Sequence, residues 1–313
     1  MKPFEICGVA VEPGATRRLE IPVTRLITQA QLSIPVIVAH GERPGPRLWL
    51  SAALHGDELN GTEIIRRVLG RVPASQLGGT LVAVPVVNVL GFVEQSRYLP
   101  DRRDLNRSFP GSRRGSLASR MAHLFLTEIV DRCTHGIDLH TGSNHRENMP
   151  QVRGDLDSAA VRRCAAAFGA PLMVHGTVIP GTLREAAGKR GIPVIVYEAG
   201  EPMRFNQSAI ALGEAGVLRV IQELGMLPSP KGRRRSASVE VRRTTWVRAH
   251  QGGIVDLRIG LGDRVKKGQV LGVVRDAFGE TVAEIKAAHT GLVIGISNNP
   301  LLHAGEALVH LAR

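Results

Sequence analysis

The chain of 313 residues has only three cysteines, Cys7, Cys133 and Cys164, which are far apart and include no CxxC pair. This number and spacing exclude a disulfide framework, so we interpret them as free thiols in a reducing compartment. No apolar run approaches the roughly 20 residues of a membrane span. Residues 1–15 mix charge, Pro and Gly and lack an apolar signal core. These absences predict a cytoplasmic protein without a membrane partner.

Aromatic residues are also scarce, at 4% of the chain, although 40 basic residues outnumber 28 acidic ones and give a net charge of +12. Such a charge is compatible with nucleic-acid binding. However, the aromatic residues do not alternate with the basic ones, as a base-stacking surface would require. We therefore interpret the charge as a solvated basic surface and expect no nucleic-acid partner.

Apolar residues make up 43% of the chain, enough for one large or two moderate domains. Up to residue 226, strand-like and helix-like segments alternate, which predicts an α/β fold. The expected strands are short and continuously apolar, as in strands buried on both faces, and cover residues 34–39, 48–54, 80–86, 136–139, 171–175 and 193–197. The expected helices cover residues 58–69, 116–133, 158–168, 182–190 and 208–224.

Composition divides the chain after residue 226. Residues 227–238 combine Pro, Gly, Ser and a run of arginines, which is typical of an interdomain linker. We therefore expect a larger domain over residues 1–226 and a β-rich domain over residues 239–313. The latter resembles the barrel-sandwich hammerhead of biotinyl and lipoyl carriers. Its hairpin at residues 275–280 lacks the lysine that carriers modify, so we expect a structural cap or an interaction module.

Two histidines and a glutamate lie where expected strands end. His55 follows residues 48–54, His140 follows residues 136–139, and Glu58 opens the next helix, where it can turn back toward His55. In an open α/β sheet, ligands bind beyond the carboxyl ends of strands. Two histidines and one glutamate are a ligand set of catalytic zinc sites that keep an open position. A lone histidine is usually a hydrogen-bonded loop or core residue, but here position and ligand type agree on a site for one Zn²⁺.

Two further carboxylates accompany these candidates. Asp138 lies two residues before His140, so both side chains share one face of a strand. Asp138 therefore either orients a ligand histidine or bonds to the backbone, and both interpretations stay open. Glu198 directly follows residues 193–197 and suits a base that exchanges a proton with water and a leaving amine. The alternative is a salt-bridged surface glutamate.

Residues 88–115 have no clear periodicity and contain many arginines. Long loops of this kind tend to be functional. Arg97, Arg103 and Arg107 could bind a carboxylate or stabilise an oxyanion, and Asn106 adds an amide donor. The alternative is a solvated run of charge, but apolar residues among them would fix this loop against the body.

Five motifs in this order resemble the succinylglutamate desuccinylase/aspartoacylase family. They are His55-Gly56-Asp57-Glu58, Arg97-Tyr98, Asp104-Leu105-Asn106-Arg107-Ser108-Phe109-Pro110-Gly111, Asp138-Leu139-His140-Thr141-Gly142 and Glu198-Ala199-Gly200. The resemblance covers nearly the whole chain. It implies a zinc carboxypeptidase-like fold, in which helices flank a mixed sheet, and a smaller all-β domain at the C-terminus.

The same resemblance implies roles for individual residues. His55, Glu58 and His140 would bind zinc, Glu198 would act as general base and acid, and Arg97 would polarise the scissile carbonyl. The family also holds a carboxylate of its substrate and uses an arginine shortly before the catalytic glutamate. The candidates for these substrate contacts are Asn106, Arg107 and Arg190, with Arg184 as the alternative to Arg190.

The resemblance predicts a zinc-dependent amidohydrolase that removes an acyl group from an N-acyl amino acid or a related small amide. Aspartoacylases bring a tyrosine from their C-terminal domain, but Tyr98 and Tyr197 both lie in the larger domain here. The chain therefore resembles the broader bacterial deacylases more closely. The alternatives are a metallocarboxypeptidase that acts on short peptides and a non-catalytic module that binds polyanions. The β-rich domain could also mediate a homo-oligomer.

Overall fold

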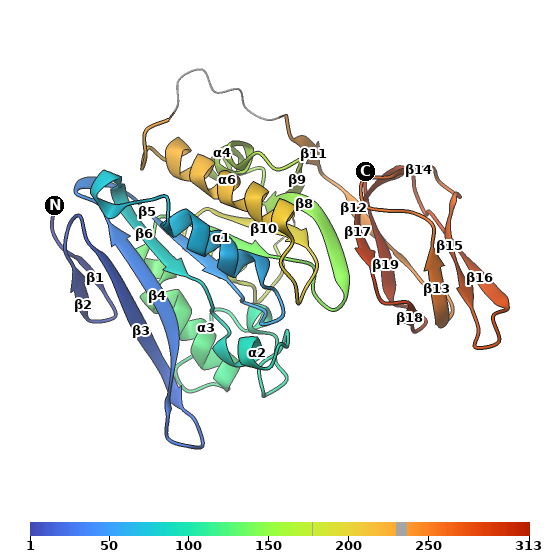
Figure 1. The fold of residues 1–313 in the computed structure, drawn as a ribbon, viewed down its shortest axis with the longest axis horizontal. Helices are drawn as coiled ribbons and strands as arrows, with labels where there is room; N and C mark the ends of the chain where they lie inside the picture. Colours follow the sequence, from blue (N-terminus) through green and yellow to red (C-terminus); the bar gives the residue numbers. More distant parts are fainter. Residues whose placement is uncertain (177, 230–236) are drawn as a thin grey trace.

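The computed structural model describes residues 1–176, 178–229 and 237–313 (Figure 1). Most of the expected linker, residues 230–236, lies outside this part. A 13-stranded mixed sheet runs through the molecule, and its main path follows the order β12-β19-β17-β8-β10-β7-β5-β6-β4-β3. The strands of its α/β part are β3 (Thr16–Arg25), β4 (Gln31–His40), β5 (Arg43–Ala52), β6 (Gly78–Val84), β7 (His135–His140), β8 (Arg146–Gly154), β9 (Leu172–His175) and β10 (Val194–Gly200).

The middle of this sheet is parallel. Strand β5 runs parallel to β6 and β7, and β10 runs parallel to β7, so the carboxyl ends of these strands meet at one edge. Strand β8 pairs antiparallel with β10, and β4 pairs antiparallel with β6. The apolar second halves of β5 and β6 are explained by burial between helices on both faces.

Helices cover both faces of the sheet and enclose two apolar cores. One face packs against α1 (Asn60–Leu69), α4 (Ala159–Phe168) and α6 (Gln207–Glu223). The other packs against α3 (Leu117–Glu128) and α5 (Leu183–Gly188). Short elements complete this part: β1 (Phe4–Ile6), β2 (Val9–Val11), α2 (Val89–Val93), and the 3₁₀ turns η1 (Ala74–Gln76), η2 (Leu105–Arg107) and η3 (Val130–Arg132).

The C-terminal region from residue 239 consists of strands, antiparallel except for the first, which pairs parallel with β9. They surround a core of their own, which includes Val247, Leu271, Val293, Leu308 and Leu311. The strands are β11 (Val239–Val241), β12 (Thr244–Arg248), β13 (Gly253–Leu257), β14 (Arg264–Val265), β15 (Val270–Arg275), β16 (Thr281–Lys286), β17 (Gly291–Ser297), β18 (Leu301–Leu302) and β19 (Ala307–Ala312). Strand β17 pairs with β8, so the large sheet continues into this region. The expected fold class is thereby confirmed.

Several local expectations need correction. Strands β3 and β8 were not expected, because their sequences are polar at many positions. Helix α1 begins at Asn60, so Glu58 lies in the turn before it. The expected loop at residues 88–115 contains the short helix α2 and the turn η2.

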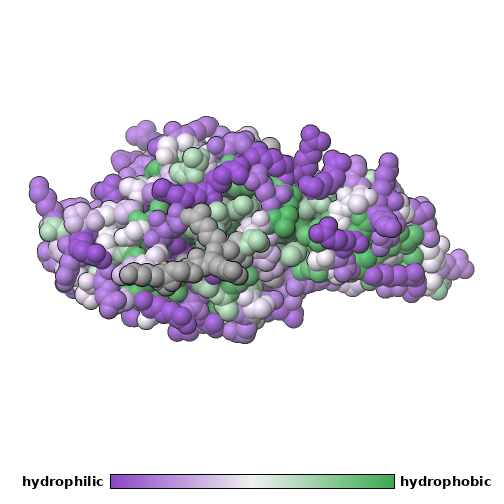
Figure 2. Space-filling view, turned by 90° about the horizontal axis from the view of Figure 1, so that it is seen from above, coloured by the Kyte–Doolittle hydropathy of each residue, from purple (hydrophilic) through white to green (hydrophobic). Residues whose placement is uncertain are grey.

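Hydrophilic residues cover much of the face in Figure 2, and hydrophobic residues gather toward the C-terminal half of the molecule. Among the described residues, no helix has the length and apolar character that a membrane crossing requires.

Gly136 on β7 lies opposite Trp49 on β5, and its missing side chain makes room for the fully buried indole. A methyl group at position 136 would overlap the indole ring. We expect Gly136→Ala to lower the free energy of unfolding by about 1–3 kcal/mol, measured by urea denaturation. Gly188→Ala, at the end of α5 with open space around it, is the control and should leave stability unchanged or slightly raised. Equal stabilities of the two variants would contradict this packing.

Candidate active site

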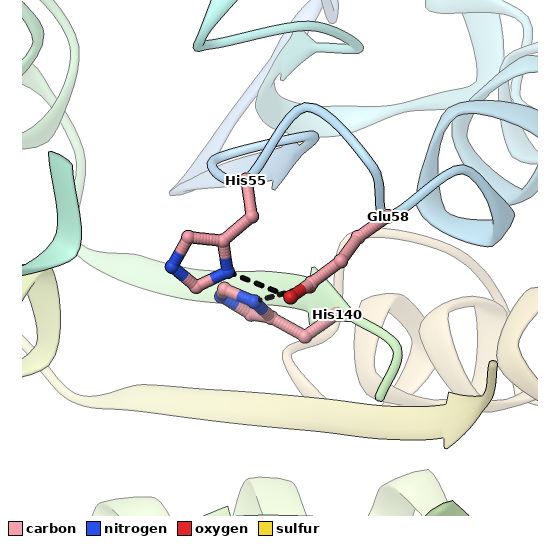
Figure 3. Close-up of side chains that lie close together, drawn as sticks. All are labelled: His55, Glu58 and His140. Atoms are coloured by element: carbon pink, nitrogen blue, oxygen red, sulfur yellow. Dashed lines mark hydrogen bonds and ion pairs between the residues drawn. The ribbon is translucent and has the colours of Figure 1, made fainter. Parts of the chain in front are cut away.

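The three expected metal ligands converge at the carboxyl edge of the sheet (Figure 3). Nδ1 of His55 and Nδ1 of His140 each lie 2.7 Å from a carboxylate oxygen of Glu58. All three side chains are buried, and their ligand atoms lie within 4.8 Å of one another. The convergence follows from parallel pairing, because Ala52 at the end of β5 lies opposite Leu139 on β7. The structure therefore brings together residues that are 85 positions apart in the sequence.

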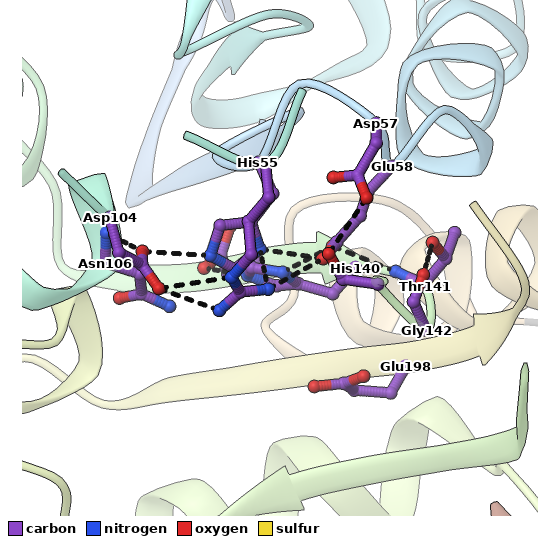
Figure 4. Close-up of polar contacts among 12 residues, drawn as sticks. His55, Asp57, Glu58, Asp104, Asn106, His140, Thr141, Gly142 and Glu198 are labelled. Atoms are coloured by element: carbon purple, nitrogen blue, oxygen red, sulfur yellow. Dashed lines mark hydrogen bonds and ion pairs between the residues drawn. The ribbon is translucent and has the colours of Figure 1, made fainter. Parts of the chain in front are cut away.

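The outer nitrogen of each histidine faces an aspartate, and Figure 4 labels the one beside His55, Asp104. His140 Nε2 lies 2.8 Å from Asp138, and His55 Nε2 lies 3.2 Å from Asp104. Asp138 also accepts a 2.7 Å hydrogen bond from the hydroxyl of Ser51. Aspartates in this position fix the tautomer and the orientation of metal-binding histidines. Of the two roles left open for Asp138, the contact with His140 is the one observed. Asp104 was not singled out from the sequence.

The electrostatics of the cluster suit a cation. Burial alone would lower the pKa of His140, but Asp138 and Glu58 raise it well above 6.5. Burial would raise the pKa of Glu58, but His55 and His140 hold it far below its ordinary value. The buried carboxylates thus draw positive charge into the site, and a bound metal ion would replace protons of the histidines.

Arg97 reaches the same cluster from the loop after α2. Its Nη2 donates a 2.8 Å hydrogen bond to Asp104, and its Nη1 lies 3.6 Å from Glu58. Burial would lower the pKa of Arg97, but Asp104 and Glu58 raise it, so the guanidinium stays charged. The predicted carbonyl-polarising group therefore lies directly beside the predicted ligands.

Glu198 lies on β10 directly opposite His140 in the parallel pairing of β10 with β7. Its carboxylate accepts a 2.7 Å hydrogen bond from Nδ2 of Asn148 on β8. Figure 4 shows Glu198 beside the histidine cluster, outside its bonded network. The half-buried carboxylate is close to the site without being one of the converging ligand groups.

These side chains line one cavity of about 300 Å³. His55, Glu58, His140, Asp138 and Glu198 belong to its wall. The loop of residues 88–115 contributes three of its predicted site residues to the same cavity, namely Arg97, Asn106 and Arg107. A volume of this size fits a small molecule.

The model of the succinylglutamate desuccinylase/aspartoacylase catalytic domain matches residues 44–224, more than half of the chain. The chain belongs to this family. The N-alpha-acetyl-L-2,4-diaminobutyric acid deacetylase of Halomonas elongata is 27% identical over 89% of this chain and 85% of its own. The product-bound ectoine utilization protein EutE (DoeB) of Ruegeria pomeroyi has a TM-score of 0.87 at 25% identity, covering 95% of this chain and 94% of its own. A family structure from Rhodobacter sphaeroides has a TM-score of 0.85 at 24% identity and covers 95% of each chain.

The two polar residues expected to hold a substrate carboxylate in this family member lie at the turn η2. Asn106 Oδ1 accepts a 2.9 Å hydrogen bond from the backbone N–H of Leu183, which fixes its amide. The exposed Arg107 donates from Nη1 to the carbonyl of Asn106 at 2.7 Å. Both side chains are thus held at the cavity wall by hydrogen bonds to the backbone.

The expected substrate contact of Arg190 needs correction. Its Nε donates a 2.6 Å hydrogen bond to Asp131, and it is not among the residues that line the cavity. Arg190 follows the end of α5, in the turn that leads to β10. Arg184, within α5, lines the cavity instead. The alternative residue therefore occupies the expected place.

Strand β8 contributes cavity residues that were not anticipated: Arg146, Asn148 and Arg153. A register shift in its pairing with β10 explains how they share a face, because Glu198 lies opposite Gln151 but Gly200 lies opposite Asn148. The extra residue on β8 reverses the alternation of its side chains. The polar residues of β8 argue against a buried strand in the sequence, but several of them line the cavity wall.

The C-terminal region adds Trp246 of β12 to the cavity. The Arg146 guanidinium lies 5.3 Å from the centroid of the Trp246 ring. The buried His310 of β19 stacks on the same indole with ring centroids 4.4 Å apart and 4° between the planes. The region therefore contributes an aromatic residue to the site, although it is a tryptophan rather than the tyrosine of aspartoacylases.

Burial and the charges of Arg153 and Arg146 lower the pKa of His310 to about 3. In the unfolded chain the imidazole of His310 has its ordinary pKa near 6.5. Between pH 6.5 and 3 it is therefore protonated in the unfolded chain and neutral in the folded chain. Stability is thus lost as the pH falls through this range. Between pH 7.5 and pH 5, we expect the free energy of unfolding of wild type to fall by up to about 2 kcal/mol more than that of His310→Phe. The phenylalanine keeps the stacking on Trp246. Parallel pH dependences in urea denaturation would contradict a neutral His310.

Proposed function

We propose that the protein is a zinc-dependent amidohydrolase that removes the acyl group of an N-acyl amino acid or a related small amide. One observation carries the proposal: Glu198 lies beside His140 on adjacent parallel strands, in a cavity that also contains the cluster of His55, Glu58 and His140. A metal-binding cluster beside a separate carboxylate is what metal-assisted hydrolysis requires. Membership of a deacylase family supports the same chemistry.

The donor set fits zinc. His55 Nδ1, His140 Nδ1 and the carboxylate of Glu58 would hold the ion, and three protein ligands leave a position open. Asp104 and Asp138 would fix the two rings from behind. When bound, zinc supplies an acidic water and polarises the scissile carbonyl.

The protein residues would then divide the remaining work. Glu198 takes a proton from water as the water oxygen bonds to the carbonyl carbon. It returns that proton to the amide nitrogen when the carbon–nitrogen bond breaks. Arg97 donates to the carbonyl oxygen as negative charge develops there. Asn106 and Arg107 hold a carboxylate of the substrate. The products are a carboxylic acid and a free amine.

Size favours a small amide over a peptide. The cavity of about 300 Å³, lined in part by Trp246 and Arg146, has limited room for a long chain. A metallocarboxypeptidase that acts on short peptides is the nearest rival. Faster hydrolysis of dipeptides than of N-acetyl amino acids would favour this rival.

The charge of the cavity points to an anionic substrate. Five arginines line it, namely Arg97, Arg107, Arg146, Arg153 and Arg184. The lining carboxylates are Glu58, Asp138 and Glu198, and each already has a hydrogen-bond partner. The Halomonas relative is named for a diamino acid. Because Glu58, Glu198 and Asp138 already serve the proposed metal binding, proton transfer and histidine orientation, a second amine would find no further carboxylate among the described lining residues. We therefore propose an N-acyl amino acid with an acidic side chain.

Three further features belong to this proposal. We assign the catalytic domain to residues 1–226, the linker to residues 227–238 and a β-rich capping domain to residues 239–313. The three free cysteines support a cytoplasmic location. Association into a homo-oligomer stays a prediction.

Glu198→Gln should lower kcat by roughly 10²–10⁴-fold, because the amide cannot accept the proton. Zinc content, measured by atomic spectroscopy, should not change. Glu201→Gln, a nearby glutamate outside the cavity lining, is the matched control and should keep its activity. Chelation should abolish turnover, and added zinc should restore it. A fully active Glu198→Gln variant, or an apoprotein that turns over normally, would refute the proposed mechanism.

Substrate charge can be tested with N-acetylglutamate and its neutral isostere N-acetylglutamine. We expect wild type to prefer the charged substrate in kcat/KM. Arg153→Gln should lower this preference about tenfold, because charged hydrogen bonds contribute about 1.5–3 kcal/mol. Arg248→Gln removes an exposed charge outside the cavity lining and should keep the preference. Equal rates for the two substrates with wild type would exclude the acidic side chain.

A further inference from the structure

The carboxylate of Glu198 is held by a residue of a neighbouring strand. Asn148 Nδ2 donates a 2.7 Å hydrogen bond to Glu198 Oε2, and only 8% of Asn148 is exposed. A carboxylate on a strand has several rotamers, and a single bonded oxygen selects among them. The bond leaves the second oxygen of Glu198 available for proton transfer.

The pairing of β8 with β10 explains why Asn148 faces Glu198. Asn148 lies opposite Gly200, two residues beyond Glu198 on β10. In a regular strand, Asn148 and Gln151 would point to opposite faces, since their separation is odd. The bulge between them turns Asn148 to the cavity face.

On its other side, β8 pairs with β17, a strand of the C-terminal region. Strand β17 pairs with β8 so that Gly295 lies opposite Asn148, and Gly295 in turn lies opposite His310 of β19. His310 then lies opposite Trp246 of β12. A single row across four strands thus runs from the cavity-lining Trp246 to the residue that holds Glu198.

At Gly295 the side chains of the neighbouring strands leave little space. A methyl group at position 295 would lie 3.1 Å from Oδ1 of Asn148 and 3.2 Å from Cβ of His310. Either the amide or the histidine would have to move. The missing side chain therefore allows Asn148 to keep the rotamer that reaches Glu198.

We propose that Asn148 is a positioning residue for Glu198, and that β17 of the C-terminal region sets the position of Asn148 through Gly295. This inference rests on the proposed role of Glu198. It extends the function of the C-terminal region from covering the cavity to aligning the proton-transferring carboxylate.

Asn148→Leu tests the first part, because leucine has a similar shape and no donor. We expect kcat to fall about 10–100-fold, as for other residues that orient a catalytic group, while KM changes less than about threefold. Zinc content should stay at the wild-type level. A residue that only supports the fold would change the melting temperature and leave kcat per folded molecule intact.

Gly295→Ala tests the second part without removing a polar group. It should lower kcat in the same direction as Asn148→Leu, because the methyl group displaces the amide. Gly260→Ala is the matched control in the same region, since a methyl group at position 260 has no neighbour within 4 Å. The control should match wild type in both kcat and KM.

Crystal structures of wild type and Asn148→Leu provide a readout that does not depend on turnover. The Glu198 carboxylate should occupy one rotamer in wild type and leave it in the variant. An unchanged Glu198 in the variant, or wild-type kcat in both Asn148→Leu and Gly295→Ala, overturns the inference. The proposed function fails separately, if Glu198→Gln keeps full activity.

Discussion

Two buried histidines share one buried carboxylate, and the rest of the structure depends on that arrangement. Glu58 lies in a turn, and His55 and His140 reach it only because β5 and β7 are parallel neighbours. Burying these groups is costly unless each polar atom is bonded. Asp104, Asp138 and Ser51 provide that bonding, and Arg97 adds positive charge beside them. The fold thus stabilises a cluster that would be unfavourable by itself.

Much of this cluster could be predicted from the sequence. Apolar runs mark β5, β7 and β10, and strand ends concentrate functional groups, so His55, His140 and Glu198 could be placed without coordinates. Their roles stay predictions, but their convergence is observed. The arginine before Glu198 could not be chosen in this way. Arg184 and Arg190 are both arginines a short distance before Glu198 in the sequence. In the structure Arg184 lies within α5 and lines the cavity, whereas Arg190 follows the end of α5 at Gly188 and is bonded to Asp131.

Strand β8 shows why other parts could not be predicted. Its sequence contains Pro150 and several charged residues, which argue against a central strand. Arg146 and Arg153 line the cavity, and Val152 belongs to the core. A bulge changes which residues share a face, and no pattern of alternation reveals it. The position of Trp246 in the cavity could not be predicted either. It depends on the successive pairing of β12 with β19, β19 with β17 and β17 with β8.

The continuation of the large sheet into the C-terminal region has an evolutionary consequence. An independent module can be exchanged between relatives at its linker, and the remaining enzyme keeps its active site. Here an incoming region must supply a strand that pairs with β8 from Arg146 to Asn148, because otherwise that edge is left unpaired at the wall of the cavity. Recombination at the linker is therefore a poor route to new specificity in this chain. Divergence should instead proceed by point substitutions on β8, β12 and β17 that preserve their pairing.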